Sequence, residues 1–157
     1  MTRAFQAKCV VLLTGVVLSM SAHAVVQAGA QLPLKSIDGQ AFKAGDQKRV
    51  KFRVANPEDP ADADTPIGRL AGCMIEGDSA YNPRTGRLYV KRPVLTCTPD
   101  TKVGAAFLGG NIMGQLSEAG LEGIPLECPK PKECTVGALK KNAEAAFTVT
   151  ETMGGGD

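Results

Sequence analysis

Short runs of alternating apolar and polar residues dominate the chain after its first 24 residues. Val50, Phe52 and Val54 occupy every second position of one such run, which is the period of a strand with one buried face. Residues 147–151 alternate in the same way. Seventeen glycines and ten prolines after residue 24 favour short strands joined by turns. The pattern predicts a mainly β fold, either a small β-sandwich or a partly open β-barrel.

A long β-hairpin is predicted over residues 69–98. The segment 70–76 forms one arm, residues 82–86 (NPRTG) supply the turn, and residues 87–98 form the other arm. Each arm would exceed the usual strand length. Gly77-Asp78 and Pro93 are therefore expected to mark bulges or breaks in the arms.

The register of this hairpin follows from its two cysteines. Residues that face each other across a symmetric hairpin have numbers with a constant sum, and pairing Cys73 with Cys97 puts the apex at Thr85, within the turn. Directly opposed Cβ atoms lie about 4.5–5.5 Å apart, close enough for a disulfide after a small adjustment.

Turns, a loop and one helix complete the expected secondary structure. Asp38-Gly39 is a hairpin-type turn signal, and residues 44–46 (AGD) indicate a second turn. Residues 56–66 contain three prolines and four acids, so an exposed loop is expected there. The residues 138–146 (ALKKNAEAA) predict the single short helix.

Two further segments lack regular periodicity. The glycine-rich residues 103–123 indicate tight turns and close backbone packing. The glycines of residues 154–157 indicate a disordered tail. Residues 25–153 therefore form the single β-rich domain of the prediction.

The N-terminus has the pattern of a secretory signal peptide. Arg3 and Lys8 precede an apolar run at residues 9–20, and small residues at 22 and 24 predict cleavage after Ala24, with residues 28–30 as a second candidate site. The alternative is a membrane anchor, but a spanning helix needs about 20 apolar residues. No later stretch is long and apolar enough to span a membrane, so the mature chain is expected to be soluble or docked to other proteins. The signal peptide places it in the periplasm, either free or associated with the outer membrane.

Removal of this leader changes the charge and the available chemistry. The chain has 18 basic residues, 16 acidic residues and one histidine. Cleavage removes Arg3, Lys8 and His23, so the mature chain is neutral and has no histidine. Histidine-dependent catalysis and histidine-ligated metal sites are then excluded. A neutral chain without tryptophan is also poorly suited to nucleic-acid binding.

Four cysteines remain in the mature chain, and an even number after a signal peptide indicates two disulfides. Three connectivities exist, and sequence proximity favours Cys73 with Cys97 and Cys128 with Cys134. A four-cysteine zinc site is the alternative, but the paired C-x-x-C spacing of such sites is missing. The second pair would close a proline-stiffened loop that displays Lys130 and Lys132, either as a docking element or as a surface staple.

Motifs for catalysis or cofactor binding are not found in the sequence. It has no nucleophile elbow, zinc signature or dinucleotide-binding fingerprint. The acids Asp59, Asp62 and Asp64 lack the calcium-loop pattern with its central glycine and distal glutamate. We therefore expect no enzymatic activity and no cofactor.

The order of several short motifs resembles a known family. A Val-Lys-Phe-Arg-Val strand (residues 50–54) precedes Leu-x-Gly-Cys at residues 70–73, and Leu-x-Cys follows at residues 95–97. Gly-Asn-Ile-Met-Gly at residues 110–114 then leads to Gly-Leu-Glu-Gly-Ile at residues 120–124. This succession is similar to the C-terminal β-domain of the TraB/TrbI family, proteins of the outer-membrane core of conjugative type IV secretion systems.

The resemblance covers about residues 48–125 and differs from the family pattern at both ends. The family has an N-terminal inner-membrane helix and a proline-rich linker, where this chain has a cleavable leader. The resemblance implies a reduced, non-enzymatic periplasmic component that docks with other secretion-apparatus proteins, as part of a ring assembly, by edge-strand pairing and loop contacts. A free-standing secreted binding module or inhibitor, using the 128–134 loop, is the alternative, and a small hydrolase ranks third.

Overall fold

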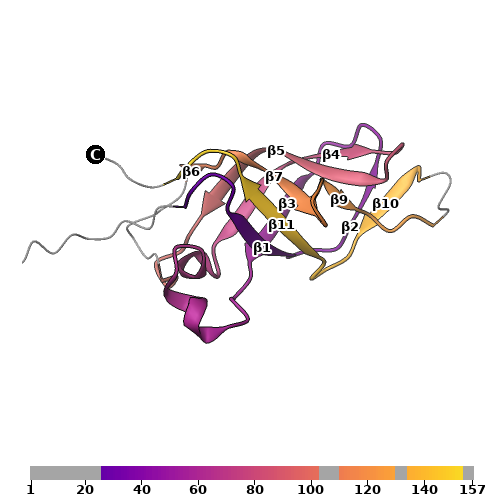
Figure 1. Ribbon diagram of the computed structural model, residues 1–157. Coiled ribbons are helices and arrows are strands. Elements are labelled where there is room, and N and C mark those ends of the chain that lie inside the picture. Colours follow the sequence, from indigo (N-terminus) through magenta and orange to yellow (C-terminus); the bar gives the residue numbers. More distant parts are fainter. Residues whose placement is uncertain (1–25, 103–109, 130–133, 154–157) are drawn as a thin grey trace, which may run out of the picture.

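A strongly curled antiparallel sheet forms most of the molecule (Figure 1). The computed structural model describes residues 26–102, 110–129 and 134–153. Nine strands form the sheet in the order β6-β5-β4-β3-β1-β11-β7-β8, with β9 against β5, and β2 and β10 form a separate ribbon. The mainly β prediction is confirmed, in the form of a half-barrel.

The strands are mostly short, as the glycines and prolines require. Their bounds are β1 (Gln31–Ser36), β2 (Gln40–Lys43), β3 (Arg49–Val54), β4 (Met74–Asn82), β5 (Arg87–Thr96), β6 (Gly110–Asn111), β7 (Gly114–Glu118), β8 (Leu121–Glu122), β9 (Ile124–Pro125), β10 (Val136–Leu139) and β11 (Glu144–Val149). Two 3-10 helices, η1 (Pro60–Asp64) and η2 (Gly68–Leu70), lie between β3 and β4.

The alternating apolar and polar residues of the sequence lie on opposite faces of the sheet. In β3, Val50, Phe52 and Val54 are at most 1% exposed, while the residues between them are exposed. The three phenylalanines of the described residues, Phe42, Phe52 and Phe147, are all fully buried. Each such side chain contributes about 2 kcal/mol of apolar burial, so these three rings support a core that has no tryptophan.

The two ends of the strand order are brought together by one stretch of chain. β6 pairs with β5 through Leu95 and Gly110, and β7, two residues later, pairs with β11 through Phe147 and Leu116. The next segment, residues 121–125, then pairs with β7 through β8 and with β5 through β9. The sheet therefore curls back toward itself instead of ending in two distant edges.

Arg87 fastens this closing segment. Its Nε donates to the carbonyl of Glu122 at 2.8 Å, and its Nη2 donates to the carbonyls of Gly123 at 2.7 Å and Leu121 at 3.3 Å. The guanidinium supplies several donors in a fixed plane, so one side chain satisfies three successive carbonyls.

The predicted hairpin forms, and its register is confirmed at the end nearest the cysteines. Met74 faces Thr96, and their residue numbers have the same sum as those of Cys73 and Cys97, as the predicted register requires. The sum falls by one beyond Gly77, where Asp78 faces Lys91. The two residues Arg92 and Pro93 therefore lie opposite the single residue Gly77, which places a bulge where one was predicted.

Close packing and backbone conformation explain the position of this bulge. A Cβ on Gly77 would lie 2.5 Å from Val90 Cγ1 and 2.7 Å from the Lys91 carbonyl oxygen. Arg92 adopts a positive φ of 49°, a conformation that costs a non-glycine residue energy. Its guanidinium forms an ion pair with Asp78, which helps to hold the bulged residue in place.

The helix predicted over residues 138–146 is wrong. The structure places strand β10 at its start and strand β11 at its end, with a turn between them in which Asn142 has a φ of 61°. β10 pairs with β2, and Ala138 also exchanges two backbone hydrogen bonds with Glu127. Tertiary pairing on both sides of β10 thus overrides the helix propensity of its alanines and lysines.

Other expectations differ in detail. Asp38-Gly39 turns the chain, but the strands that it joins, β1 and β2, belong to different sheets, so it is not a hairpin turn. Residues 44–46 do form a turn, closed by the Asp46 amide on the Lys43 carbonyl. The predicted leader (1–24) and tail (154–157) lie outside the described residues. Within the described part of the chain, no helix has the length and apolar character needed to cross a membrane.

Candidate docking surface

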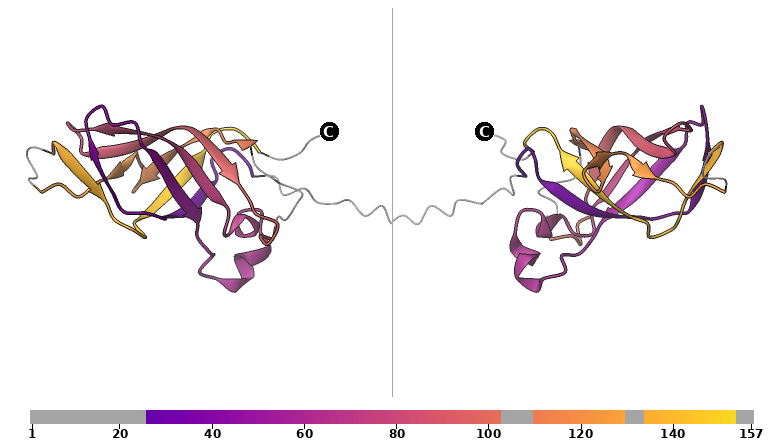
Figure 2. Two further views of the ribbon diagram at one scale, coloured as in Figure 1. Left: turned by 180° about the vertical axis from the view of Figure 1, so that it is seen from behind. Right: turned by 45° about the vertical axis from the view of Figure 1, so that its right-hand side comes forward.

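A compact projection separates β3 from β4, and we call residues 56–72 the knob. The knob contains both 3-10 helices, and Figure 1 shows it in magenta, below the curled sheet. Both views of Figure 2 place it at the opposite end of the molecule from the β2–β10 ribbon. The exposed loop predicted for residues 56–66 is therefore exposed but ordered.

The start of the knob has a local cause in the sequence. The Asp59 carboxylate accepts a hydrogen bond from the Ala61 amide at 2.8 Å, and Pro60 follows at the first helical position. An acidic cap followed by proline is a helix-start signal. The dipeptide Asp59-Pro60 was thus the clue to η1 that the loop prediction did not use.

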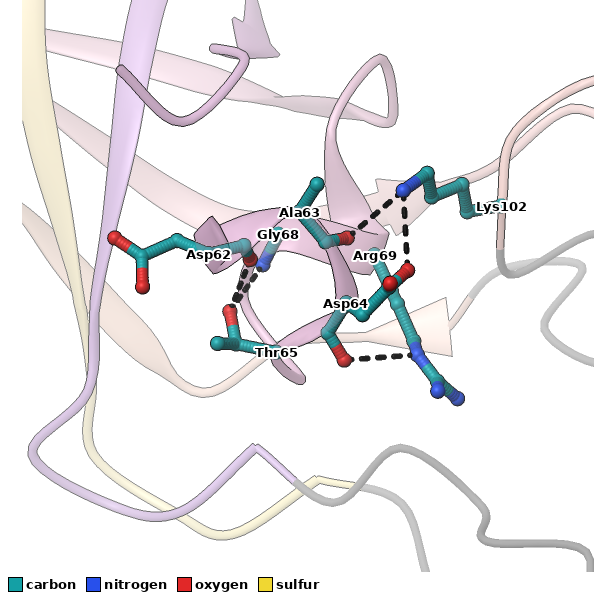
Figure 3. Close-up of polar contacts among 7 residues, drawn as sticks. All are labelled: Asp62, Ala63, Asp64, Thr65, Gly68, Arg69 and Lys102. Atoms are coloured by element: carbon teal, nitrogen blue, oxygen red, sulfur yellow. Dashed lines mark hydrogen bonds and ion pairs between the residues drawn. The ribbon is translucent and has the colours of Figure 1, made fainter. Parts of the chain in front are cut away.

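Polar contacts hold the knob in one conformation (Figure 3). Arg69 Nε donates to the Asp64 carbonyl at 3.1 Å. From outside the knob, Lys102 Nζ reaches both the Ala63 carbonyl and Asp64 Oδ1 at 3.2 Å. Thr65 Oγ1 accepts from the Gly68 amide at 3.1 Å and donates to the Asp62 carbonyl at 2.7 Å.

The base of the knob is fixed to the sheet by the first disulfide. Cys73 and Cys97 are bonded with a Cα–Cα distance of 4.4 Å, as the hairpin register predicted. Val54 and Cys73 are also joined directly, because the Val54 amide donates to the Cys73 carbonyl at 2.8 Å. Leu70, only 3% exposed, anchors the knob in the core. The knob therefore projects from a part of the sheet that is held by a disulfide, a backbone hydrogen bond and a buried leucine.

Two hollows flank the segment that leads into the knob. The larger, about 850 Å³, is lined by residues of β1, β3, the start of β11 and the base of the knob. Its charged lining residues are three bases and three acids: Lys35, Arg53, Lys141, Asp38, Glu58 and Glu144. The smaller, about 290 Å³, lies between the knob and residues 100–102. Asn56 and Pro57 line both hollows and form the wall between them.

Charge is distributed unevenly around this region. The knob carries four carboxylates and one cation, with Glu58, Asp59, Asp62 and Asp64 all exposed. The outer face of β3 instead presents Arg49, Lys51 and Arg53.

Neighbouring carboxylates offset the β3 cations only in part. Glu76 lies 3.5 Å from Arg49 and 4.0 Å from Lys51, whereas Arg53 forms no ion pair with any described residue. The knob and the β3 face therefore have opposite net charge.

The carboxylates of the knob do not form a metal site. Asp59 caps η1 and Asp64 contacts Lys102. In the ranges that the structure describes, no three histidine, cysteine, aspartate or glutamate side chains are grouped so as to hold a metal ion. Asp100, beside the smaller hollow, has a pKa below its ordinary value because the Thr98 hydroxyl hydrogen-bonds to its carboxylate.

The second disulfide lies at the far end of the molecule. Cys128 and Cys134 are bonded with a Cα–Cα distance of 5.2 Å, as sequence proximity predicted. Lys130 and Lys132, expected at the tip of this loop, lie outside the described residues. All four predicted cysteines are thus paired as expected, but the two disulfides do not form one common site.

A buried tyrosine supports this second disulfide, a feature that the sequence reading did not identify. The Tyr81 hydroxyl, in a side chain only 8% exposed, donates to the Cys134 carbonyl at 2.7 Å and also contacts Cys134 Sγ. Burial raises the pKa of Tyr81. Tyr81 and Cys134 are 53 residues apart, so no local motif signals their contact.

No protein-family model matches the chain, and no curated protein matches it.

Proposed function

We propose that this chain is a non-enzymatic, periplasmic structural component of a conjugative or type IV secretion apparatus. In this proposal the β-domain docks with other envelope proteins as part of a multi-protein assembly, which is a ring in the family that the sequence resembles. The proposal rests on the short motifs of residues 48–125 together with the way the fold connects them.

One observation carries the proposal. The Gly-Cys and Leu-x-Cys motifs of the resemblance meet at the open end of one hairpin, where Cys73, just before β4, is bonded to Cys97, just after β5. The Val-Lys-Phe-Arg-Val motif is β3, which pairs with β4 along five residues. Three motifs that are separated in the sequence thus form one continuous, covalently braced surface, and this is the kind of rigid element that a structural component needs.

The strand edges of the sheet change the expected mode of docking. Edge-strand pairing requires a free strand edge, but β6 and β8, at the ends of the strand order, have only two residues each. At β2, Lys48 Nζ donates to the Ala41 carbonyl at 2.5 Å, and a lysine at a strand edge opposes pairing with another chain. The proposal therefore places docking on the knob and the neighbouring sheet face.

Size fractionation of detergent-solubilised cell envelopes tests this function. We expect the chain to elute in a large complex and to co-purify with other secretion proteins. Elution at the size of a single chain, without secretion proteins, would overturn the proposal and favour the free-standing binding module. A variant with Cys73→Ser and Cys97→Ser should no longer elute in the large complex, because it lacks the disulfide at the base of the knob.

A further inference from the structure

We propose that the outer face of β3 is a docking surface for the knob of a second copy of this chain. The inference goes beyond the proposed function by naming the surface and the partner, and it rests on that function only for its biological setting. It combines two observations: the opposite charges of the two surfaces and their different shapes. Within one molecule only the base of the knob contacts β3, through the Gly72 amide that donates to the Val54 carbonyl at 3.0 Å.

The charges are complementary and incompletely neutralised within the molecule. Asp62, on the exposed side of η1, and Arg53, on the exposed face of β3, form no ion pair with the described residues of their own chain. Surfaces of opposite charge guide association and fix its register. At an ionic strength of about 0.1 M charges attract over roughly 10 Å, so this attraction acts at short range and weakens as salt is added.

The shapes also fit. The knob is a projection held rigid by Lys102, Arg69 and the disulfide at its base. The hollow of about 850 Å³ beside Arg53, with the base of the chain's own knob as one wall, offers space for a projecting turn of a second copy. A rigid element loses little conformational entropy on docking, so less of the interaction free energy is offset by ordering.

The geometry has a consequence for assembly. Donor and acceptor are two different surfaces of the chain, so a copy that docks its knob still has its own β3 face available. Such a heterologous contact allows association to continue beyond a dimer. A self-complementary patch would instead stop at two copies.

Charge reversal with complementation tests the contact, with the oxidised protein and sedimentation equilibrium in low-salt buffer. We expect wild type to self-associate, and Asp62→Lys and Arg53→Glu each to raise the dissociation constant at least about 10-fold. An equal mixture of the two variants should associate again, because the lysine of one then meets the glutamate of the other. The controls are Lys43→Glu, on the β2–β10 ribbon, and Glu151→Lys, which reverse exposed charges on neither surface and should associate like wild type.

Several results would overturn the inference: a wild-type protein that stays monomeric at low salt, variants that associate like wild type, or a mixture that fails to recover. The outcome is separable from that of the proposed function. If both charge variants lose self-association but still co-purify with secretion proteins, the contact is supported and the function is intact. If wild type does not self-associate but does co-purify, only the contact is wrong.

Discussion

The two disulfides stabilise the molecule in different ways. Cys73–Cys97 has a sequence separation of 24 and joins the two ends of the β4–β5 hairpin, while Cys128–Cys134 has a separation of 6 and lies near the β2–β10 ribbon. In the chain-entropy description, closing these loops, each counted with both of its cysteines, corresponds to about 3.5 and about 2.4 kcal/mol of stabilisation. The first bond therefore adds more to global stability, and the second acts on a local loop.

The burial of the two disulfides also differs. Cys73 and Cys97 are at most 3% exposed and belong to the main core. Cys134, 7% exposed, belongs to the same core, but its partner Cys128 is only partly buried. The Tyr81 hydroxyl gives Cys134 an additional contact. The comparison shows how a small sheet with few aromatic residues distributes its covalent support, with one bond bracing the fold and the other closing a surface loop.

The largest expected effect comes from removing the first disulfide. Cys73→Ser with Cys97→Ser should lower the free energy of unfolding by at least about 3.5 kcal/mol, because buried hydroxyls replace the bond and the loop is no longer closed. Urea denaturation measures this change. A loss below about 1 kcal/mol would contradict the bracing role.

Removing the second disulfide should cost less. Cys128→Ser with Cys134→Ser is expected to lower the free energy of unfolding by about 2.4 kcal/mol. The same urea titration compares the two double variants directly. If the second variant were the less stable of the two, the assigned roles would be reversed.

Tyr81 allows a finer test of the second bond. Tyr81→Phe removes the hydrogen bond to the Cys134 carbonyl and should cost about 1 kcal/mol. The loss should appear both in wild type and in the variant that lacks Cys128 and Cys134, because the acceptor is a backbone oxygen. A double-mutant cycle of these variants measures the coupling free energy between Tyr81 and the Cys128–Cys134 disulfide. If Tyr81→Phe cost nothing in the variant without the disulfide, the contact with Cys134 Sγ would dominate instead.

The smallest expected effect is on alkaline stability. Because burial raises the pKa of Tyr81 above its ordinary value of 10.0, the folded state favours the neutral phenol. This contribution is fully present below pH 10 and is lost as pH rises through the raised pKa. In a Tyr89→Phe variant, ultraviolet titration should show the remaining tyrosine ionising above pH 10, and ionisation below that value would contradict its burial.

The sequence predicted local features of the sheet well. Alternation located β3, and the cysteine positions gave the register of the hairpin, because both depend on neighbours in the chain or on one symmetric turn. Gly77 and Pro93 marked the bulge because each disturbs regular pairing. These predictions needed no knowledge of distant strands.

Features that depend on distant contacts were missed. Residues 138–146 have helix propensity, yet Ala138 pairs with Ala41 in β2 and with Glu127. The knob owes its form partly to Lys102, 38 residues from Asp64. The closing role of Arg87 likewise depends on carbonyls more than 30 residues away. Local propensity gives no information about such partners.

Mapping the disulfides in protein from the periplasmic fraction tests the central comparison most directly. Trypsin, applied without reduction, should leave residues 70–84 linked to residues 92–102, and residues 103–132 linked to residues 133–140. We predict these two linked pairs and no free thiol. Free cysteines, or a peptide of the first pair linked to one of the second, would contradict the division of roles between the two disulfides.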